Sequence, residues 1–149
     1  MAGSWDAADF PRLTPDSFVT TSPATHRYNC IAWAAGETRR KWWPDPANIG
    51  YWPKGAPRKE TLDAFVLAYK TLGYSVCEDG SLEPGFQKIA LFTKRYLSGT
   101  RPTHAALQLP SGRWTSKLGD LEDIDHVNLD ALRGPAYGAV ACYLKRLRP

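Results

Sequence analysis

The sequence predicts one α+β domain with a mainly antiparallel sheet. Helical patterns come first along the chain and most strand patterns come later, which is the order typical of α+β proteins. A chain of 149 residues fits a single domain with its own core. Hydrophobic residues make up 43% of the chain and charged residues 23%, as in ordinary globular proteins. We expect residues 1–24 to form an extended N-terminal arm and residues 25–149 to form the core.

Two segments carry helix signals. Asn29 is a favourable N-cap before the apolar run 30–35, and Gly36 is typical of the position after a helix end. This helix is apolar on most sides, so we expect it to be buried. In residues 58–72 apolar side chains recur at three- and four-residue steps, and Gly73 follows them. These residues predict the longer helix.

The segment between these helices, residues 37–57, is rich in proline and predicts a loop. Three of the six tryptophans of the chain lie in it: Trp42, Trp43 and Trp52. Their rings either pack the loop onto the domain or form a platform for a substrate, since rigid aromatic side chains give contact area at low entropic cost.

The remaining elements follow from shorter patterns. Period-two alternation and apolar runs predict strands, and clusters of polar residues predict loops. We expect strands at 74–77, 86–93 and 137–144, a hairpin at 103–118, a basic loop at 94–102, and an acidic irregular segment at 119–136 with one helical turn. One short helix is also expected after Thr14.

The turn of the hairpin fixes its register. Pro110 and Gly112 favour a three-residue loop with a type I turn and a bulge. In that register Ala106 faces Ser116, and the side chains of 104, 106 and 108 share a face with those of 114, 116 and 118. A two-residue loop would present Lys117 instead.

One of the three cysteines is a candidate nucleophile. The cysteines are odd in number and widely spaced, so they predict neither a disulfide framework nor a zinc site. Cys30 begins the short helix, where unpaired backbone N–H groups lower a thiol pKa and are able to bind an oxyanion. Cys77 and Cys142 lie in strand-like apolar runs and are expected to be small buried side chains.

The base that a thiol nucleophile needs must come from elsewhere in the chain. His104 begins a strand and is followed by the small residues Ala105 and Ala106, which leave room for another element. We expect His26 to point back along the arm. His126 lies in an acidic turn, where we expect an exposed or ion-paired imidazole.

A catalytic imidazole usually needs an orienting partner. In the expected hairpin Ser116 lies diagonal to His104, and Gln108 is on the same face, so either is a candidate. Trp114 shares this face and either covers the imidazole or belongs to the core. No metal set has convincing spacing; His104, Asp120 and His126 form the one possible group, and we do not expect it to bind a metal.

Charge and targeting signals narrow the class of protein. The net charge is +4 and the pI about 9.0, with basic residues in small clusters that are able to attract phosphates or an anionic protein. A solvated surface is the simpler explanation, and no nucleic-acid-binding motif is present. The chain shows no apolar run of about 18 residues and no signal-peptide pattern, so we expect a cytoplasmic protein without a membrane span.

Two resemblances add to these expectations. The segments Asn29-Cys30-Ile31-Ala32-Trp33 and His104-Ala105-Ala106-Leu107-Gln108 resemble NlpC-type papain-like cysteine peptidases and amidases, whose third catalytic position falls on Ser116. This resemblance implies a papain-like fold in which a central helix carrying the cysteine packs on the sheet. The chain also resembles, over residues 28–144, a bacterial family of small uncharacterised domains.

Together these observations predict a thiol hydrolase or acyltransferase (peptidase, amidase or deamidase) that needs no cofactor. Its substrate would be a peptide, a protein or an amide-bearing small molecule. The catalytic candidates are Cys30, His104, Ser116 and Gln108, and the substrate-binding candidates are Asn29, Trp42, Trp43, Trp52 and Trp114. The alternative is a catalytically inactive papain-like domain that binds a protein or peptide, and nucleic-acid binding is a third, less favoured option. The oligomeric state is left open.

Overall fold

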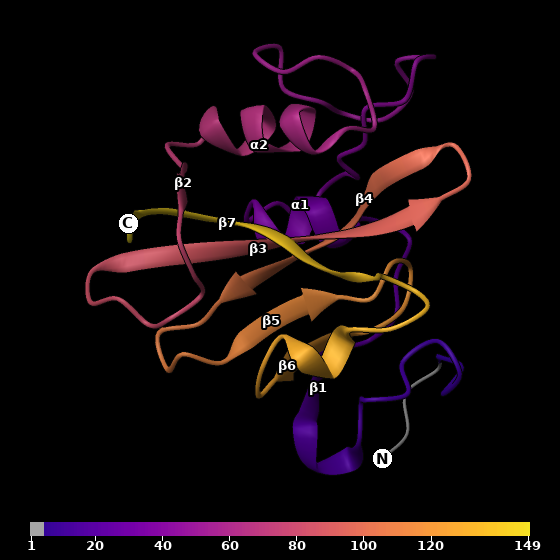
Figure 1. Ribbon diagram of the computed structural model, residues 1–149, viewed down its shortest axis with the longest axis vertical. Coiled ribbons are helices and arrows are strands. Elements are labelled where there is room, and N and C mark those ends of the chain that lie inside the picture. Colours follow the sequence, from indigo (N-terminus) through magenta and orange to yellow (C-terminus); the bar gives the residue numbers. More distant parts are fainter. Residues whose placement is uncertain (1–4) are drawn as a thin grey trace.

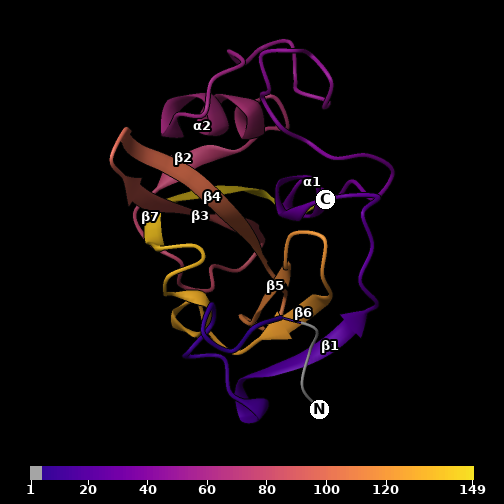
Figure 2. The same ribbon diagram turned by 90° about the vertical axis from the view of Figure 1, so that its right-hand side faces the viewer.

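The computed structural model describes residues 5–149 and consists mainly of a seven-stranded antiparallel sheet (Figures 1 and 2). The strand order is β1-β6-β5-β4-β3-β7-β2. The strands are β1 (Phe18–Ser22), β2 (Ser75–Cys77), β3 (Phe86–Tyr96), β4 (Gly99–Gln108), β5 (Trp114–Lys117), β6 (Asp123–His126) and β7 (Ala139–Leu147).

The α-helices are few and short, and they correct the expected fold. Helix α1 (Cys30–Ala34) has five residues and α2 (Leu62–Lys70) has nine. Two 3-10 turns, η1 (Pro15–Ser17) and η2 (Asp130–Leu132), complete the regular structure of residues 5–149. The expectation of a papain-like α+β fold is therefore wrong, because the sheet dominates and no long helix of the described residues packs on it. No helix in the described part of the chain has both the length and the apolar character needed to cross a bilayer.

Three segments form strands where the sequence predicted irregular chain. Residues 94–102 were expected to be a loop, but they extend β3 and β4 into one long hairpin whose paired residues include Arg95 and Thr100. The segment 119–136 contains β6, and the N-terminal arm contributes β1, which pairs with β6 at the sheet edge. These strands are polar on their exposed side, so their pairing partners, rather than their own pattern, determine their conformation.

The sheet is covered on both faces. Along β3, Ile89 and Leu91 face one core cluster while Ala90 and Phe92 face the other, as the period of two requires. Helices α1 and α2 and the tryptophan-rich loop cover the first face, where Figure 1 shows both helices on one side of β3. The N-terminal arm and η2 cover the second face, with Phe10 only 5% exposed.

The hairpin of β4 and β5 has the register predicted from its turn. Leu107 pairs with Thr115 and Gln108 with Trp114. The Leu109 N–H donates to Arg113 O at 2.7 Å, and Gly112 has a positive φ of 92° at the bulge. This prediction is confirmed.

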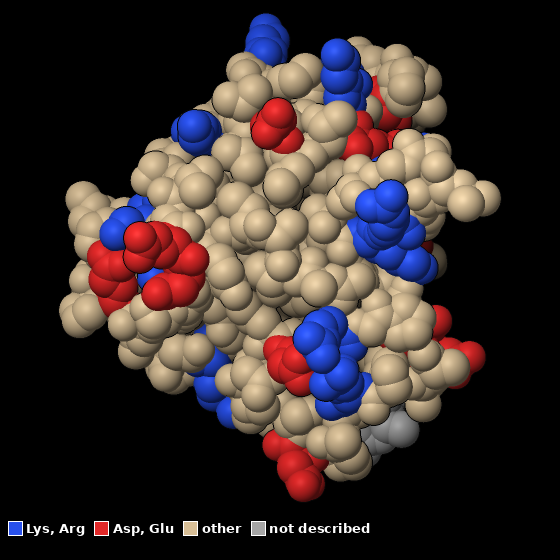
Figure 3. All heavy atoms as spheres, in the orientation of Figure 1, with Lys and Arg blue, Asp and Glu red and all other residues tan. Residues whose placement is uncertain are grey.

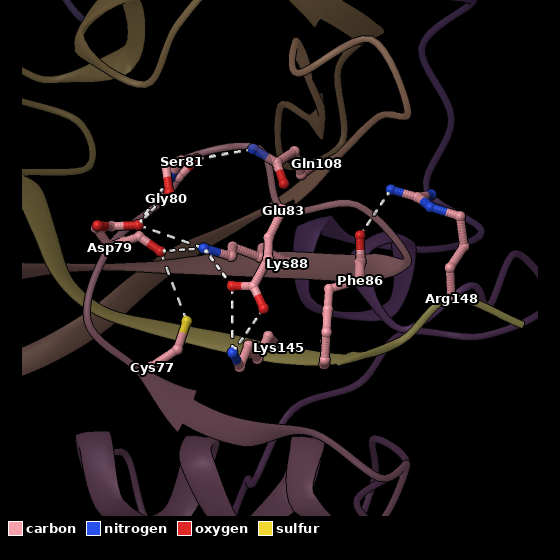
Figure 4. A network of polar contacts seen from close by, with 10 residues as sticks. All are labelled: Cys77, Asp79, Gly80, Ser81, Glu83, Phe86, Lys88, Gln108, Lys145 and Arg148. Atoms are coloured by element: carbon pink, nitrogen blue, oxygen red, sulfur yellow. Dashed lines mark hydrogen bonds and ion pairs between the residues drawn. The ribbon is translucent and has the colours of Figure 1, made fainter.

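A charged network attaches the loop after β2 to the sheet (Figure 4). The ammonium of Lys88 on β3 is 2% exposed and donates to Asp79 O at 3.0 Å. Glu83 accepts from Lys145 of β7 at 2.9 Å, and Gly80 O accepts from the Gln108 amide at 2.7 Å. The network therefore holds residues 79–83 against β3, β4 and β7.

Candidate functional site

Both polar atoms of the side chain of Asn29, the N-cap residue of the short helix α1, form hydrogen bonds. The Asn29 Oδ1 atom accepts from the N–H groups of Ala32 and Trp42, each at 3.1 Å, and its Nδ2 donates to Trp42 O at 2.8 Å. Asn29, a predicted substrate-binding residue, therefore caps α1 and ties it to the tryptophan-rich loop. The position of Cys30 is fixed as a consequence.

The thiol of Cys30 lies beside the backbone of β4. Its Sγ is 3.9 Å from Thr103 O, and the backbone of Ala105 hydrogen bonds to the sulfur. The carbonyl of residue 103 and the N–H of residue 105 point to the same side of a strand, so the sulfur lies next to the backbone of His104. Lys117 of β5 also acts electrostatically on the sulfur, which places it on the side of β4 that faces β5.

The electrostatics of this position favour the neutral thiol. Cys30 is 5% exposed, and burial raises the pKa of its thiol to about 11. The backbone groups of Ala105, Ile31 and Cys30 act in the opposite direction, as does the ammonium of Lys117. Burial outweighs them, so the expected lowering of the thiol pKa by the helix start does not prevail.

The imidazole of His104 belongs to a buried chain of polar side chains. Its Nε2 lies 2.9 Å from Ser116 Oγ, and that oxygen lies 2.8 Å from His126 Nε2. The Nδ1 of His126 lies 2.8 Å from Asn128 O. His104, Ser116 and His126 each have an exposed fraction of 0%. The chain thus joins β4, β5 and β6 through the second core.

Aromatic rings cover the His104 imidazole. The Tyr137 ring stacks on it with centroids 4.1 Å apart, and the Phe92 ring meets it edge-on at 5.4 Å. Burial holds the pKa of His104 well below its usual value, and His126 acts in the same direction. The Nδ1 atom is buried and has no hydrogen-bond partner among residues 5–149.

The structure places the predicted pair at neighbouring positions along β4 without joining it: the Cys30 side chain belongs to the first core cluster, whereas the His104 ring packs against Phe92 and Tyr137 of the second. The Cys30 sulfur contacts the backbone on either side of His104, but within residues 5–149 no hydrogen bond connects the sulfur to a ring nitrogen of His104. Ser116 does lie beside His104, on the face where the register of the hairpin places it.

The other candidates lie away from the sulfur or within the core. Gln108 donates to Gly80 O and does not contact His104 by a hydrogen bond. Trp42, Trp52 and Trp114 are 4%, 5% and 4% exposed, so these rings pack the domain. Trp43 differs, because it is half-buried and lines a hollow of about 340 Å³.

This hollow is adjacent to the candidate pair. Besides Trp43 its lining includes Thr103, whose carbonyl contacts the Cys30 sulfur, and Tyr137, whose ring covers His104. Arg101 and Glu60 give it charges of both signs.

Sequence reasoning missed the roles of His126 and Tyr137. His126 was expected to be exposed or ion-paired, yet it is fully buried and hydrogen bonded to Ser116. The alternation of Ile124 and His126 along β6 is the signal that would have placed both on the core face. Nothing in the sequence indicates that Tyr137 stacks on His104.

The described residues offer no metal centre. Within the range 5–149 no group of three or more His, Cys, Asp and Glu side chains is arranged to hold a metal ion. Asp120, which the sequence grouped with His104 and His126 as a possible metal set, pairs with Lys41 at 2.8 Å and with His26 at 3.1 Å.

Comparison with known proteins places the chain in a family. Residues 19–145 match the model of the domain of unknown function DUF7689, and the chain belongs to this family. The expected resemblance to a family of small uncharacterised domains is consistent with this match, whereas nothing supports membership of the NlpC-type or papain-like families. No significant match was found among curated proteins or among solved structures.

Proposed function

We propose that the protein is a thiol-dependent hydrolase or acyltransferase that acts on a peptide, a protein or an amide-bearing small molecule. The nucleophile is Cys30 and the base is His104. One observation carries the proposal. The His104 imidazole has one nitrogen fixed by Ser116 and the other buried without a hydrogen-bond partner in residues 5–149, and the backbone beside His104 contacts the Cys30 sulfur.

The reaction follows from these groups. The Cys30 thiol gives its proton to Nδ1 of His104 as the sulfur attacks the carbonyl carbon of the substrate. The proton then passes from the imidazolium to the leaving amine, and an acyl thioester remains on the sulfur. Water or a second amine attacks the thioester with its proton taken by His104, and the product acid or amide leaves as the thiol is restored.

The resting pair is neutral. Burial raises the pKa of the Cys30 thiol to about 11 and holds the pKa of His104 well below its usual value, so no thiolate–imidazolium pair forms before substrate arrives. Proton transfer therefore accompanies attack on the substrate. Simple alkylation would report mainly the exposure of each thiol, so the test needs an electrophile that forms an acyl enzyme.

The test uses p-nitrophenyl acetate, a small activated ester, with a Cys77→Ala, Cys142→Ala variant that retains Cys30 as its only cysteine. We expect release of nitrophenol together with an acetyl adduct on Cys30, identified by mass spectrometry. Adding Cys30→Ala should lower the rate by at least about 100-fold, since nucleophile and base act together.

The matched control is Cys30→Ser, which keeps the size of the side chain and tests whether folding is preserved. Equal ester hydrolysis by the double variant with and without Cys30, and no acetyl adduct, would exclude Cys30 as a nucleophile. Loss of hydrolysis with a preserved thermal unfolding transition supports the proposal.

A second candidate function is binding of an acidic protein or peptide segment. A groove of about 810 Å³ lies against the tryptophan-rich loop, and four cationic side chains but no acidic one line it. Arg58 donates to Gly50 O at 2.6 Å and to Asp45 O at 2.8 Å, which fixes the loop. Arg40 lies over the Tyr51 ring at 3.5 Å from its centroid. The groove is therefore lined by cationic side chains and held in shape.

The charge distribution favours a peptide over nucleic acid. On the face seen in Figure 3, Lys and Arg side chains form separate small groups, several of them beside acidic groups, with uncharged surface between them. Three of the four groove cations have acidic partners: Arg40 with Glu37, Lys41 with Asp120, and Arg58 with Asp45. Nucleic-acid binding generally uses a continuous basic surface.

A fluorescent Glu-rich peptide tests this second function, with the peptide in which Gln replaces each Glu as its control. Lys54 lines the groove, is exposed, and has no ion pair with a residue in the range 5–149. We expect Lys54→Glu to weaken binding by about 5- to 10-fold, through loss of one attraction and gain of one repulsion. Equal binding of the two peptides would rule out this function.

A further inference from the structure

The hydrogen bonds that link Asn128, His126, Ser116 and His104 all run in one direction from donor to acceptor. The backbone carbonyl oxygen of Asn128 can only accept a hydrogen bond. Nδ1 of His126, 2.8 Å away, therefore carries a proton and is the donor. In a neutral imidazole the other nitrogen is then an acceptor. Nε2 of His126 consequently accepts from the Ser116 hydroxyl at 2.8 Å.

The direction of the Ser116 hydrogen bond also determines the tautomer of His104. A serine hydroxyl has one proton, and in this chain it is directed at His126. Ser116 Oγ therefore meets Nε2 of His104 as an acceptor at 2.9 Å, which requires a proton on that nitrogen. Nδ1 of His104 is left with its lone pair, and it has no hydrogen-bond partner among residues 5–149.

Within residues 5–149 the His104 ring has no hydrogen bond other than the one to Ser116. The Tyr137 ring stacks flat on it, with an interplanar angle of 12°, and the Phe92 ring meets its edge. Neither ring offers a hydrogen-bonding atom at these contacts. Without His126 the Ser116 hydroxyl would be free to donate to Nε2 of His104, which would move the proton of His104 to Nδ1.

We propose that His126 is a positioning residue that acts through Ser116 and keeps the proton of His104 on Nε2, so that Nδ1 is free to accept the thiol proton. The catalytic consequence rests on the proposed function of Cys30 and His104. The tautomer itself does not depend on that function and is measured without turnover.

The experiment records long-range proton–nitrogen correlation spectra of ¹⁵N-histidine-labelled protein near neutral pH. In the wild-type protein we expect a protonated Nε2 and a bare Nδ1 for His104, and the opposite arrangement for His126. His126→Phe should convert His104 partly or wholly to the Nδ1-protonated form. His126→Gln should preserve the wild-type tautomer, because its Oε1 is able to accept from Ser116.

His26→Phe is the matched control, because His26 has a side chain 85% exposed at the surface and lies outside the chain of hydrogen bonds. It should leave the tautomer of His104 unchanged. If His126→Phe fails to fold, Ser116→Ala provides the second variant: it removes the hydroxyl, and His104 should then show a mixture of tautomers.

Kinetics separate positioning from a purely structural role. In the ester assay His126→Phe should lower kcat by about 10- to 100-fold with KM little changed. This loss is smaller than the loss expected when the general base itself is removed. His126→Gln should restore most of the lost kcat. A wild-type His104 with the proton on Nδ1, or a tautomer unaffected by both His126→Phe and Ser116→Ala, would overturn the inference. The expected tautomers with no acyl adduct on Cys30 would instead refute only the proposed function.

Discussion

The thiol of Cys30 lies 3.9 Å from the carbonyl oxygen of Thr103, the residue that immediately precedes His104. This contact places the sulfur against the strand instead of in open solvent. A carbonyl oxygen favours the protonated thiol, and burial does so more strongly. The ionisation of this thiol is therefore coupled to the folding of the chain, so the free energy of unfolding should depend on pH in the range where the thiol titrates.

Alkaline pH should destabilise the protein partly through Cys30. Burial raises the pKa of this thiol from a usual value of 9.0 to about 11. The unfolded thiol loses its proton above pH 9 while the folded one keeps it, so the free energy of unfolding falls as the pH rises from 9 to 11. The loss attributable to Cys30 is on the order of 2 to 3 kcal/mol.

Denaturant unfolding of wild type and Cys30→Ser between pH 8 and 11 measures this loss. Serine does not titrate in that range, so its curve should be flatter. The tyrosines titrate in both proteins, and Cys30 contributes to the raised pKa of Tyr69 and of Tyr137, so the difference between the curves includes this coupling. Parallel curves would mean that the Cys30 thiol ionises as easily in the folded protein as in the unfolded one.

Acidic pH should destabilise the protein through His126. Burial lowers the pKa of its imidazole from a usual value of 6.5 to about 4. Below pH 6.5 the unfolded imidazole binds a proton that the folded one does not, so stability present above this pH is lost as the pH falls to 4. The loss is on the order of 3 kcal/mol.

The same unfolding measurement between pH 7 and 4 compares wild type with His126→Gln, which cannot titrate there. The variant should lose less stability across this range than the wild-type protein. An identical dependence in both proteins would contradict a buried neutral His126.

Removal of the ring that covers His104 should restore part of its basicity. The Tyr137 ring stacks on the imidazole at 4.1 Å, and burial holds the pKa of His104 well below its usual value. Tyr137→Ala would admit water, so the midpoint of the His104 titration measured by NMR should rise. Tyr137→Phe keeps the ring and should leave that midpoint nearly unchanged; a rise of the same size in both variants would mean that stacking does not protect the imidazole.

Gly138 should tolerate no side chain. Its φ is 75°, and a Cβ atom there would lie 2.0 Å from Thr93 O, which is part of the backbone and has little freedom to shift. Gly138→Ala should lower the free energy of unfolding by about 1 to 3 kcal/mol or more, from overpacking together with an unfavourable φ. Thermal or urea unfolding measures the difference.

Gly119 supplies the control for this substitution. Its φ is 62°, and a Cβ atom would meet nothing within 4 Å. Gly119→Ala therefore carries the conformational cost alone, about 1 to 2 kcal/mol. If the two variants lose equal stability, the contact with Thr93 has no effect and the conformation of Gly138 is its only requirement.

Local signals in the sequence were sufficient for several elements. Asn29 caps α1, as the polar residue before this apolar run indicates. The second helix was predicted in the right place but too long, because α2 spans Leu62–Lys70 with Thr61 as its N-cap, within the expected range 58–72. The Pro110 and Gly112 turn determined the register of β4 and β5, and with it the position of Ser116 beside His104. Capping and turn chemistry act between residues a few positions apart, so they are visible in a single sequence.

The balance of helix and sheet depended on distant partners. Residues 94–102 form strands because β3 and β4 continue to pair there, and β1 and β6 form because each supplies hydrogen bonds to the other. A polar segment carries no strong pattern of its own, and the resemblance to papain-like enzymes favoured more helix than the chain contains.

The sequence by itself determined the cap of α1 and the register of the β4–β5 hairpin, and it supplied the candidates for thiol chemistry. Only the tertiary structure decided that Cys30 is a buried neutral thiol, that Tyr137 covers His104, and that His126 completes a chain through Ser116. Burial and hydrogen-bond direction are set by groups brought together from separate strands. The protonation state of a candidate site therefore depends on the fold, even where its residues are evident from the sequence.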